Sequence, residues 1–173
     1  MSQKESERRN PTMPDGSEFL LGEFERTLDE RFRVSIPAEL AEPLTAESTD
    51  CILAKERPGC LSLWNAAKWQ ARLDDGVELV KQKMRAGKLQ ERVAEVQLLG
   101  RLLSTRHRPV SLAGRGRLLI PEGFREFLGV EPNGEVLVLG AAVCLELWRP
   151  AVWIKYLETR MPKFRKLFDR LSN

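Results

Sequence analysis

Residues 29–37 read DERFRVSIP, and residues 113–121 read AGRGRLLIP. Both stretches place two arginines two positions apart, followed by two further residues and an Ile-Pro pair. The second stretch follows the first at a constant offset of 84 residues. The same offset aligns further pairs without a gap: Leu28 with Leu112, Cys60 with Cys144, Trp64 with Trp148, and Trp69 with Trp153. This repetition indicates that the chain is built from two copies of one structural unit.

Each copy predicts the same order of short elements. In the first, apolar runs at 24–28, 34–36, 51–54 and 60–64 are typical of strands, and Pro37 and Asn65 suit the starts of helices. In the second, we expect strands at 118–120, 135–139 and 143–148, a turn at 140–142, and helices that open at Pro121 and Pro150. A unit of four short strands cannot bury its apolar face alone. We therefore expect a mainly β protein with helices (α+β), in which two tandem β-turn-β repeats form one closed, pseudo-symmetric sheet structure flanked by helices.

The predicted organisation has five parts. They are a disordered polar tail (1–18), repeat 1 (19–73), a helical connector (74–108), repeat 2 (109–157) and a basic C-terminal helix or tail (158–173). In the connector, apolar residues recur at helical spacing after interruptions at Gly76 and Gly87; they are Leu89, Val93, Val96, Leu99 and Leu103. Two interpretations are open for this helix, one that it covers the sheet and the other that it forms an oligomer interface. We expect Pro162 to separate the last helix from the one before it.

Composition excludes several classes of protein. The 173 residues carry 28 basic and 25 acidic side chains, a net charge of +3, and no apolar run approaches the roughly 18 residues of a membrane span. The polar N-terminus has no apolar core of a secretory signal, which favours a cytoplasmic location. Three widely spaced cysteines and one histidine form neither a disulfide framework nor a zinc site, and buried inert thiols are expected. Neither a nucleophile–base constellation nor a phosphate-binding loop is present, so we expect no catalytic residue, metal, cofactor or small-molecule substrate.

The four tryptophans are expected to pack in the core rather than to stack on nucleic acid bases.

The two arginine turns are the candidate functional feature. Arg31 and Arg33 in the first turn, and Arg115 and Arg117 in the second, carry permanent charges and planar donor groups that suit phosphates and the guanine edge. The alternative is that hairpin turns are charged because they are solvated. Local charge favours a polyanion partner, because residues 101–125 carry +5 and residues 154–173 carry +4.

At these residues the sequence resembles the MraZ family of bacterial transcription regulators, tandem relatives of the AbrB-like swapped-hairpin DNA-binding fold. The resemblance runs from about residue 21 to residue 156 and includes GRLLS at 100–104 and LELW at 145–148. It implies an AbrB-like barrel and a sequence-specific, nucleoid-associated regulator that binds double-stranded DNA as a homo-oligomeric ring. It also implies that short direct repeats upstream of cell-division and cell-wall genes are recognised through the arginines, without enzymatic activity or a cofactor.

The family signature is a D-x-x-G-R turn in each repeat, and both turns depart from it. Repeat 1 keeps Asp29 and Arg33 but has Phe32 in place of glycine, and repeat 2 keeps Gly116 and Arg117 but has Ala113 in place of aspartate. Because an aromatic residue disfavours positive φ, we expect the first turn to be reshaped. Without a carboxylate to orient it, Arg117 is expected to be less preorganised, and the neighbouring Gly114 cannot supply one.

The predicted roles follow from these turns. Arg33 and Arg117 are expected to contact bases or phosphates, and Arg31 and Arg115 to contact phosphates. Asp29 is expected to orient its arginine, and Gly114 and Gly116 to shape the second turn. The alternative function is an oligomeric AbrB-like scaffold or protein-binding module that has lost specific DNA recognition.

Overall fold

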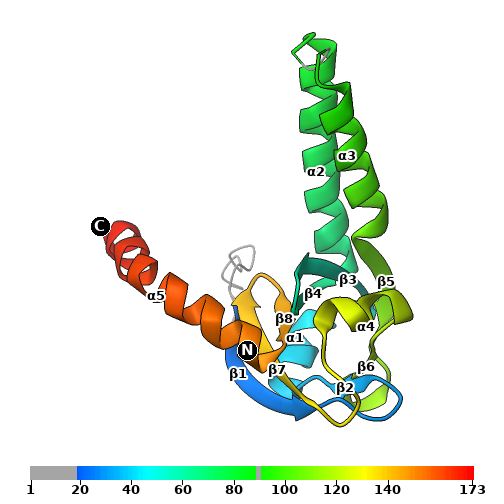
Figure 1. The fold of residues 1–173 in the computed structure, drawn as a ribbon, viewed down its shortest axis with the longest axis vertical. Coiled ribbons are helices and arrows are strands. Elements are labelled where there is room, and N and C mark those ends of the chain that lie inside the picture. The colour runs from blue at the N-terminus through cyan, green and yellow to red at the C-terminus, as the bar shows by residue number, and fades with distance from the viewer. Residues whose placement is uncertain (1–18, 89–90) are drawn as a thin grey trace, which may run out of the picture.

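The computed structural model describes residues 19–88 and 91–173 (Figure 1). The tail at 1–18 and Leu89 of the predicted connector helix lie outside the described residues. The strands are β1 (Leu20–Thr27), β2 (Arg33–Ser35), β3 (Asp50–Arg57), β4 (Cys60–Asn65), β5 (His107–Ser111), β6 (Arg117–Leu119), β7 (Glu135–Ala142) and β8 (Leu145–Trp148). The helices are α1 (Ala38–Leu44), α2 (Ala66–Arg85), α3 (Val93–Thr105), α4 (Glu122–Leu128) and α5 (Pro150–Ser172), with a short 3₁₀ turn, η1, at Gly114–Gly116. The prediction of an α+β fold is confirmed, but the expectation that the protein is mainly β is wrong, because the described helices hold more residues than the strands.

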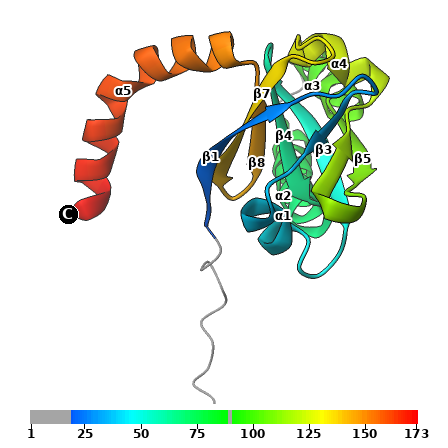
Figure 2. The same cartoon turned by 90° about the horizontal axis from the view of Figure 1, so that it is seen from below.

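Six strands form one antiparallel sheet in the order β1-β7-β8-β4-β3-β5, and β2 pairs with β6 in a separate two-stranded ribbon (Figure 2). Strands from the two halves of the chain alternate as partners: β1 pairs with β7, β5 with β3, and β4 with β8. Within the described residues, β1 and β5 are the two edges of the sheet and do not meet. The sheet is therefore open, and the prediction of a closed barrel is wrong, because β2 and β6 leave the sheet to pair with one another.

The main core lies between one face of the sheet and a layer made by the β2–β6 ribbon, α1 and α4. Alternate sheet residues such as Leu53, Leu63 and Leu145 are fully buried on this face, as strand periodicity requires. Val34 and Leu118 of the ribbon pack in the same buried cluster, together with Leu40 of α1 and Phe124 of α4. The sheet, the ribbon and the two helices therefore all contribute to one core. This packing holds the ribbon firmly against the sheet.

The opposite face of the sheet is covered by the first turns of α2 and α5. Trp64 of β4 meets Trp69 of α2 with ring centroids 5.7 Å apart, and Trp148 of β8 meets Trp153 of α5 at 5.1 Å. Each helix begins directly after its strand. Asn65 caps α2 by accepting hydrogen bonds from the backbone N–H groups of the following turn. The prediction that the tryptophans pack in the core is confirmed.

Beyond these first turns, the helices leave the body of the molecule. Figure 1 shows α2 and α3 side by side as a hairpin that projects from the sheet, and no residue of α3 is buried. The interpretation that the connector covers the sheet is therefore wrong, and so is the predicted interruption at Gly76, through which α2 continues. None of the described helices is both long and apolar enough to span a lipid bilayer.

Two predicted boundaries are also wrong. The α5 helix continues through Pro162 as one element and bends along its length (Figure 2), since a proline can kink a helix whose flanking residues favour helix. Residues 140–142, predicted as a turn, belong to β7 and pair with Leu20, Leu21 and Gly22 of β1. The small residues at 140–142 pair closely with β1, a strand that is distant in the sequence, and do not form a turn.

Candidate nucleic-acid interface

The β2–β6 ribbon places Arg33 and Arg117 on one outward face. Arg33 lies opposite Leu119, and Arg117 lies opposite Ser35, while Val34 and Leu118 pair between them. Val34 and Leu118 are 1% and 0% exposed, so their face of the ribbon points into the core. Because alternate strand residues point to opposite faces, the other four side chains point outward. A two-stranded ribbon of this kind fits the width of the DNA major groove.

Each end of the ribbon is tied to the turn of the other half. The Ile120 N–H donates to the Phe32 carbonyl at 2.8 Å, and the Ile36 N–H donates to the Gly116 carbonyl at 2.8 Å. Phe32 and Gly116 both adopt positive φ, at 58° and 69°. The isoleucine of each Ile-Pro pair therefore fixes the turn of the other half from across the ribbon.

In the first turn, one carboxylate organises the backbone and an arginine. Asp29 Oδ1 accepts from the backbone N–H groups of Arg31 and Arg33 at 2.8 and 2.9 Å, and Asp29 Oδ2 accepts from Arg33 Nε at 2.9 Å. The backbone hydrogen bond from Arg33 is the main cause that lowers the pKa of Asp29. Arg33 is half-buried and held by this pair, whereas Arg31 is exposed. Asp29 thus has the orienting geometry that the sequence predicted, although its role in binding remains a prediction.

The second turn keeps the backbone pattern but has no carboxylate. The Ala113 N–H donates to the Arg117 carbonyl at 2.9 Å, matching the bond from Asp29 N–H to the Arg33 carbonyl. Arg115 adopts a positive φ of 63°, which is uncommon for a residue with a side chain, while Arg31 does not. Arg115 and Arg117 are exposed, and neither makes an ion pair with another residue of ranges 19–88 and 91–173. Gly114, also exposed, begins the η1 turn.

Phe32 keeps the backbone conformation that the family signature assigns to glycine. Its φ of 58° is close to that of Gly116, so the prediction that the first turn is reshaped is wrong. The strained conformation is supported by packing: Phe32 lies against the core, and the Arg125 guanidinium lies 4.2 Å from its ring centroid. Arg125 Nε also donates to the Ile120 carbonyl at 2.9 Å. Tertiary contacts therefore offset the local preference against positive φ.

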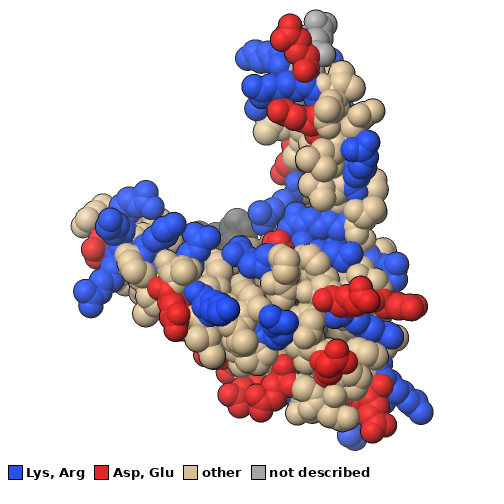
Figure 3. Space-filling view, in the orientation of Figure 1, with Lys and Arg blue, Asp and Glu red and all other residues tan. Residues whose placement is uncertain are grey.

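The basic segments do not gather into one patch. Arg106 pairs with Glu56 at 2.9 Å near the base of α2 and α3, and Arg125 packs on Phe32. The basic residues of α5 lie along the projecting arm, and acidic and basic side chains lie side by side along the lower edge of the molecule (Figure 3). The local charges of +5 and +4 are therefore divided among several surfaces.

Two outward residues of the ribbon were missed from the sequence. Ser35 and Leu119 share the exposed face with Arg33 and Arg117, and Leu119 is 51% exposed. The alternation of each with its buried neighbour, Val34 or Leu118, is the signal that would have identified them. A hydroxyl and an apolar side chain, each directly opposite one of the arginines, suit a base edge and a thymine methyl group.

The described residues hold no grouping of three or more side chains that suits a metal ion. The three cysteines are buried, as expected, and burial raises the pKa of Cys51 to about 11 and of Cys144 to about 12. Burial also raises the pKa of Cys60. At neutral pH these thiols stay protonated and do not act as nucleophiles.

Comparison with known proteins adds independent information. Residues 108–172 match the family model described as "MraZ protein, putative antitoxin-like". The chain is 28% identical over 153 residues to the "Transcriptional regulator MraZ" of Treponema denticola, which covers 88% of this chain and 97% of that protein. The protein of the same name from Syntrophomonas wolfei is 25% identical over 153 residues, covering 88% and 96%. That from Roseiflexus castenholzii is 29% identical over 135 residues, covering 78% and 84%.

Proposed function

We propose that the chain is a member of the MraZ family and a sequence-specific DNA-binding transcriptional regulator, as its match to the family model and its similarity to relatives of that name support. The observation that carries the proposal is the β2–β6 ribbon, which presents Arg33 and Arg117 on one outward face between two fixed turns. The relatives are named transcriptional regulators and not enzymes, so we assign the chain no catalytic activity.

In this proposal, the arginines of the ribbon and of its turns contact different parts of the DNA. Arg33 and Arg117 contact base edges in the major groove, and the exposed Arg31 and Arg115 contact the flanking phosphates. Asp29 holds Arg33 in place, which lowers the conformational entropy that this side chain loses on binding. Arg117 has no such partner among the described residues, so the second turn contributes less to affinity than the first.

The two halves are proposed to act as one pseudo-symmetric AbrB-like unit, comprising repeat 1 (19–73) and repeat 2 (109–157). This is supported by the alternation of strands from the two halves in the sheet and by the reciprocal ties across the ribbon. The targets implied by the family resemblance are short direct repeats upstream of cell-division and cell-wall genes. Such targets would place the protein on the nucleoid.

Assembly into a homo-oligomeric ring is part of the proposal. The α5 arm exposes an apolar series at helical spacing: Ile154, Leu157, Met161, Phe164, Leu167, Phe168 and Leu171. The α2/α3 hairpin exposes a second set: Leu79, Met84, Val93, Leu98, Leu99 and Leu102. Two different apolar faces on opposite arms support head-to-tail contacts, which close into rings when the rotation between copies permits. A ring multiplies the ribbons that engage repeated DNA sites at once.

The test is fluorescence anisotropy of the full chain on two labelled duplexes, one from the region upstream of its own gene and one with the same bases shuffled. Each is titrated at several salt concentrations. We expect tighter binding to the upstream duplex and a steep fall of affinity as salt rises, because binding releases counterions from DNA. Replacing Arg33 and Arg117 together by alanine is expected to weaken binding at least about tenfold and to remove the preference between the duplexes.

The matched control removes two exposed arginines at the far end of the α2/α3 hairpin, Arg85→Ala with Arg92→Ala. This variant loses the same charge but is expected to keep the preference for the upstream duplex. Equal losses in the two double variants would show that net charge, and not the ribbon, governs binding.

A second candidate function is an oligomeric scaffold or protein-binding module without specific DNA recognition. It is favoured by the mixture of acidic and basic side chains along the lower edge of the molecule and by the missing carboxylate at Ala113 (Figure 3). Undetectable DNA binding at low salt would support this candidate and overturn the first.

A further inference from the structure

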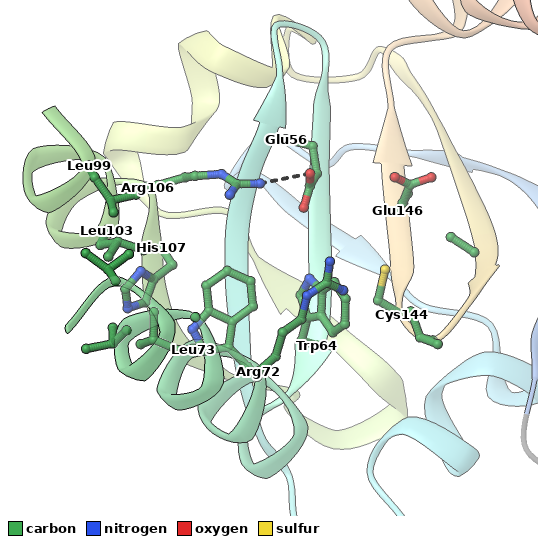
Figure 4. A pocket seen from close by; sticks show the side chains of 16 residues that line it. Glu56, Trp64, Arg72, Leu73, Leu99, Leu103, Arg106, His107, Cys144 and Glu146 are labelled. Carbon is green, nitrogen blue, oxygen red and sulfur yellow. Dashed lines mark hydrogen bonds and ion pairs between the residues drawn. The ribbon is translucent and has the colours of Figure 1, made fainter. Parts of the chain in front are cut away.

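A cavity of about 430 Å³ lies between the base of the α2/α3 hairpin and the sheet face opposite to the ribbon (Figure 4). Its walls are largely apolar and come from both helices and from the sheet, with Leu73, Val77, Val80, Leu99, Leu103 and Val143 among them. The volume lies in the range of sites that bind small organic molecules.

Two buried polar atoms of this wall have no hydrogen-bond partner among the described residues. They are Trp69 Nε1 and His107 Nδ1, which belong to rings whose centroids lie 5.2 Å apart. The indole groups of Trp64 and Trp148 do find acceptors, at Ser62 Oγ (2.9 Å) and Glu146 Oε1 (3.4 Å). Trp69 is only 9% exposed, so its unused donor is costly unless another molecule accepts from it.

The hydrogen-bonding properties of Trp69 Nε1 and His107 Nδ1 determine which ligand group can bind both atoms. An indole N–H only donates, and His107 Nδ1 accepts when the neutral ring carries its proton on Nε2. A hydroxyl group satisfies both, because its oxygen accepts from Trp69 and its hydrogen is donated to His107. Carboxylates accept but do not donate, and a methyl group does neither.

The charged side chains that line the cavity balance one another. Arg106 pairs with Glu56 at 2.9 Å, and the Arg72 guanidinium of α2 lies 4.9 Å from the Trp64 ring centroid, while Glu146 belongs to β8 (Figure 4). The lining thus holds two guanidinium groups and two carboxyl groups. This balance favours a neutral ligand over an anion or a cation.

A glycine keeps the cavity open. Gly76 lies inside α2 and lines the cavity, and a Cβ atom at this position would meet no atom within 4 Å. Glycine weakens a helix interior, and here neither a positive φ nor a close approach requires it. The missing side chain leaves room beside Trp69 and Arg72 on the same helix.

We propose that this cavity binds a small neutral molecule with an apolar, ring-sized body and one hydroxyl group, held between Trp69 Nε1 and His107 Nδ1. The site lies on the sheet face away from the arginine turns. It goes beyond the proposed function and does not depend on DNA binding.

The test follows the indole N–H resonances of the full ¹⁵N-labelled chain, with Trp69→Phe used to assign the Trp69 signal. The probes are phenol, toluene, which lacks the hydroxyl, and benzoate, which carries a charge. We expect phenol to shift the Trp69 signal saturably, toluene to bind about fivefold more weakly, and benzoate to bind more weakly than phenol. An unmoved Trp69 signal, equal affinity for toluene, or tighter binding of benzoate would each overturn the proposal.

Two helical glycines provide a matched pair of variants. Gly76→Leu fills the cavity and is expected to abolish the phenol response, while Gly100→Leu in α3, which also has open space but does not line the cavity, keeps it. Circular dichroism checks that both variants fold, and Val80→Phe serves as a second filling variant. A full phenol response in the folded filling variants would contradict the assignment of the site.

Discussion

A single position distinguishes the two arginine turns. Asp29 accepts three hydrogen bonds, two from backbone N–H groups and one from Arg33 Nε, while its counterpart Ala113 accepts none with its side chain. In the second turn Arg115 adopts a positive φ that Arg31 avoids. The carboxylate therefore fixes both the backbone of the turn and the direction of the arginine.

The first prediction restores the carboxylate with Ala113→Asp. We expect the free energy of unfolding to rise by about 1 kcal/mol at pH 7, because the new side chain can accept from the N–H groups of Arg115 and Arg117. Hydrogen bonds depress the pKa of a carboxyl group in the folded state, as they do for Asp29. The gain is therefore complete above the unfolded pKa of about 4 and is lost as pH falls through the lower folded value.

Urea titrations between pH 3 and pH 7 measure this effect. Gly114→Asp, which adds the same charge one position along the exposed turn, is the control and is expected to show no such gain. A gain that persists unchanged at low pH, or that the control shares, would contradict a hydrogen-bonded carboxylate.

Among the elements, the β2–β6 ribbon depends most on contacts between the halves. It has three residue pairs, too few for independent stability, and it is held by its buried face and by the two isoleucine ties. The positive φ at Phe32 and Gly116 directs a carbonyl of each turn toward the opposite strand. The ribbon and its turns therefore form one rigid element.

The second prediction concerns the glycine of this element. A Cβ atom on Gly116 would lie 2.7 Å from the Ile36 carbonyl oxygen, and φ is +69°, whereas a Cβ atom on Gly114 would meet no atom within 4 Å. Gly116→Ala is expected to lower the free energy of unfolding by about 2 kcal/mol, and Gly114→Ala by less than about 0.5 kcal/mol. Denaturant melts of both variants test the difference, and equal losses would show that the tie across the ribbon has no structural role.

In the whole molecule, the α2/α3 hairpin and α5 project as two arms from the body that contains the sheet. Phe164 and Phe168 on α5 are 58% and 59% exposed, and their rings lie 6.0 Å apart at the end of the arm far from the sheet. Exposed apolar series of this length mark interaction surfaces. Since the core does not use these side chains, we expect that they can be replaced without unfolding the body.

The third prediction uses this separation. Replacing Phe164 and Phe168 together by serine is expected to reduce the molecular mass in solution to that of smaller assemblies, while the melting temperature of the body changes little. Light scattering after gel filtration measures the mass, and circular dichroism checks the fold. Replacing the neighbouring Lys163 and Lys166 by serine is the control; an unchanged mass in the phenylalanine variant would exclude this face from assembly.

Much of the fold follows from local sequence. Strand alternation at Val34 and Leu118, the N-cap at Asn65 and the prolines at 37, 121 and 150 determine where the short elements begin, because these preferences depend on neighbouring residues. The internal repeat and the candidate arginines are likewise visible in the chain itself.

What the tertiary structure alone decided depends on contacts between distant residues. Phe32 takes a conformation that its own side chain disfavours, because Arg125 and the Ile120 N–H stabilise it from the other half of the chain. The open sheet and the cavity beside Trp69 likewise arise from which segments meet. The sequence by itself determined the short elements and the candidate arginines. Arg33 and Arg117 share one outward face only because β2 and β6, which are far apart in the chain, pair with each other.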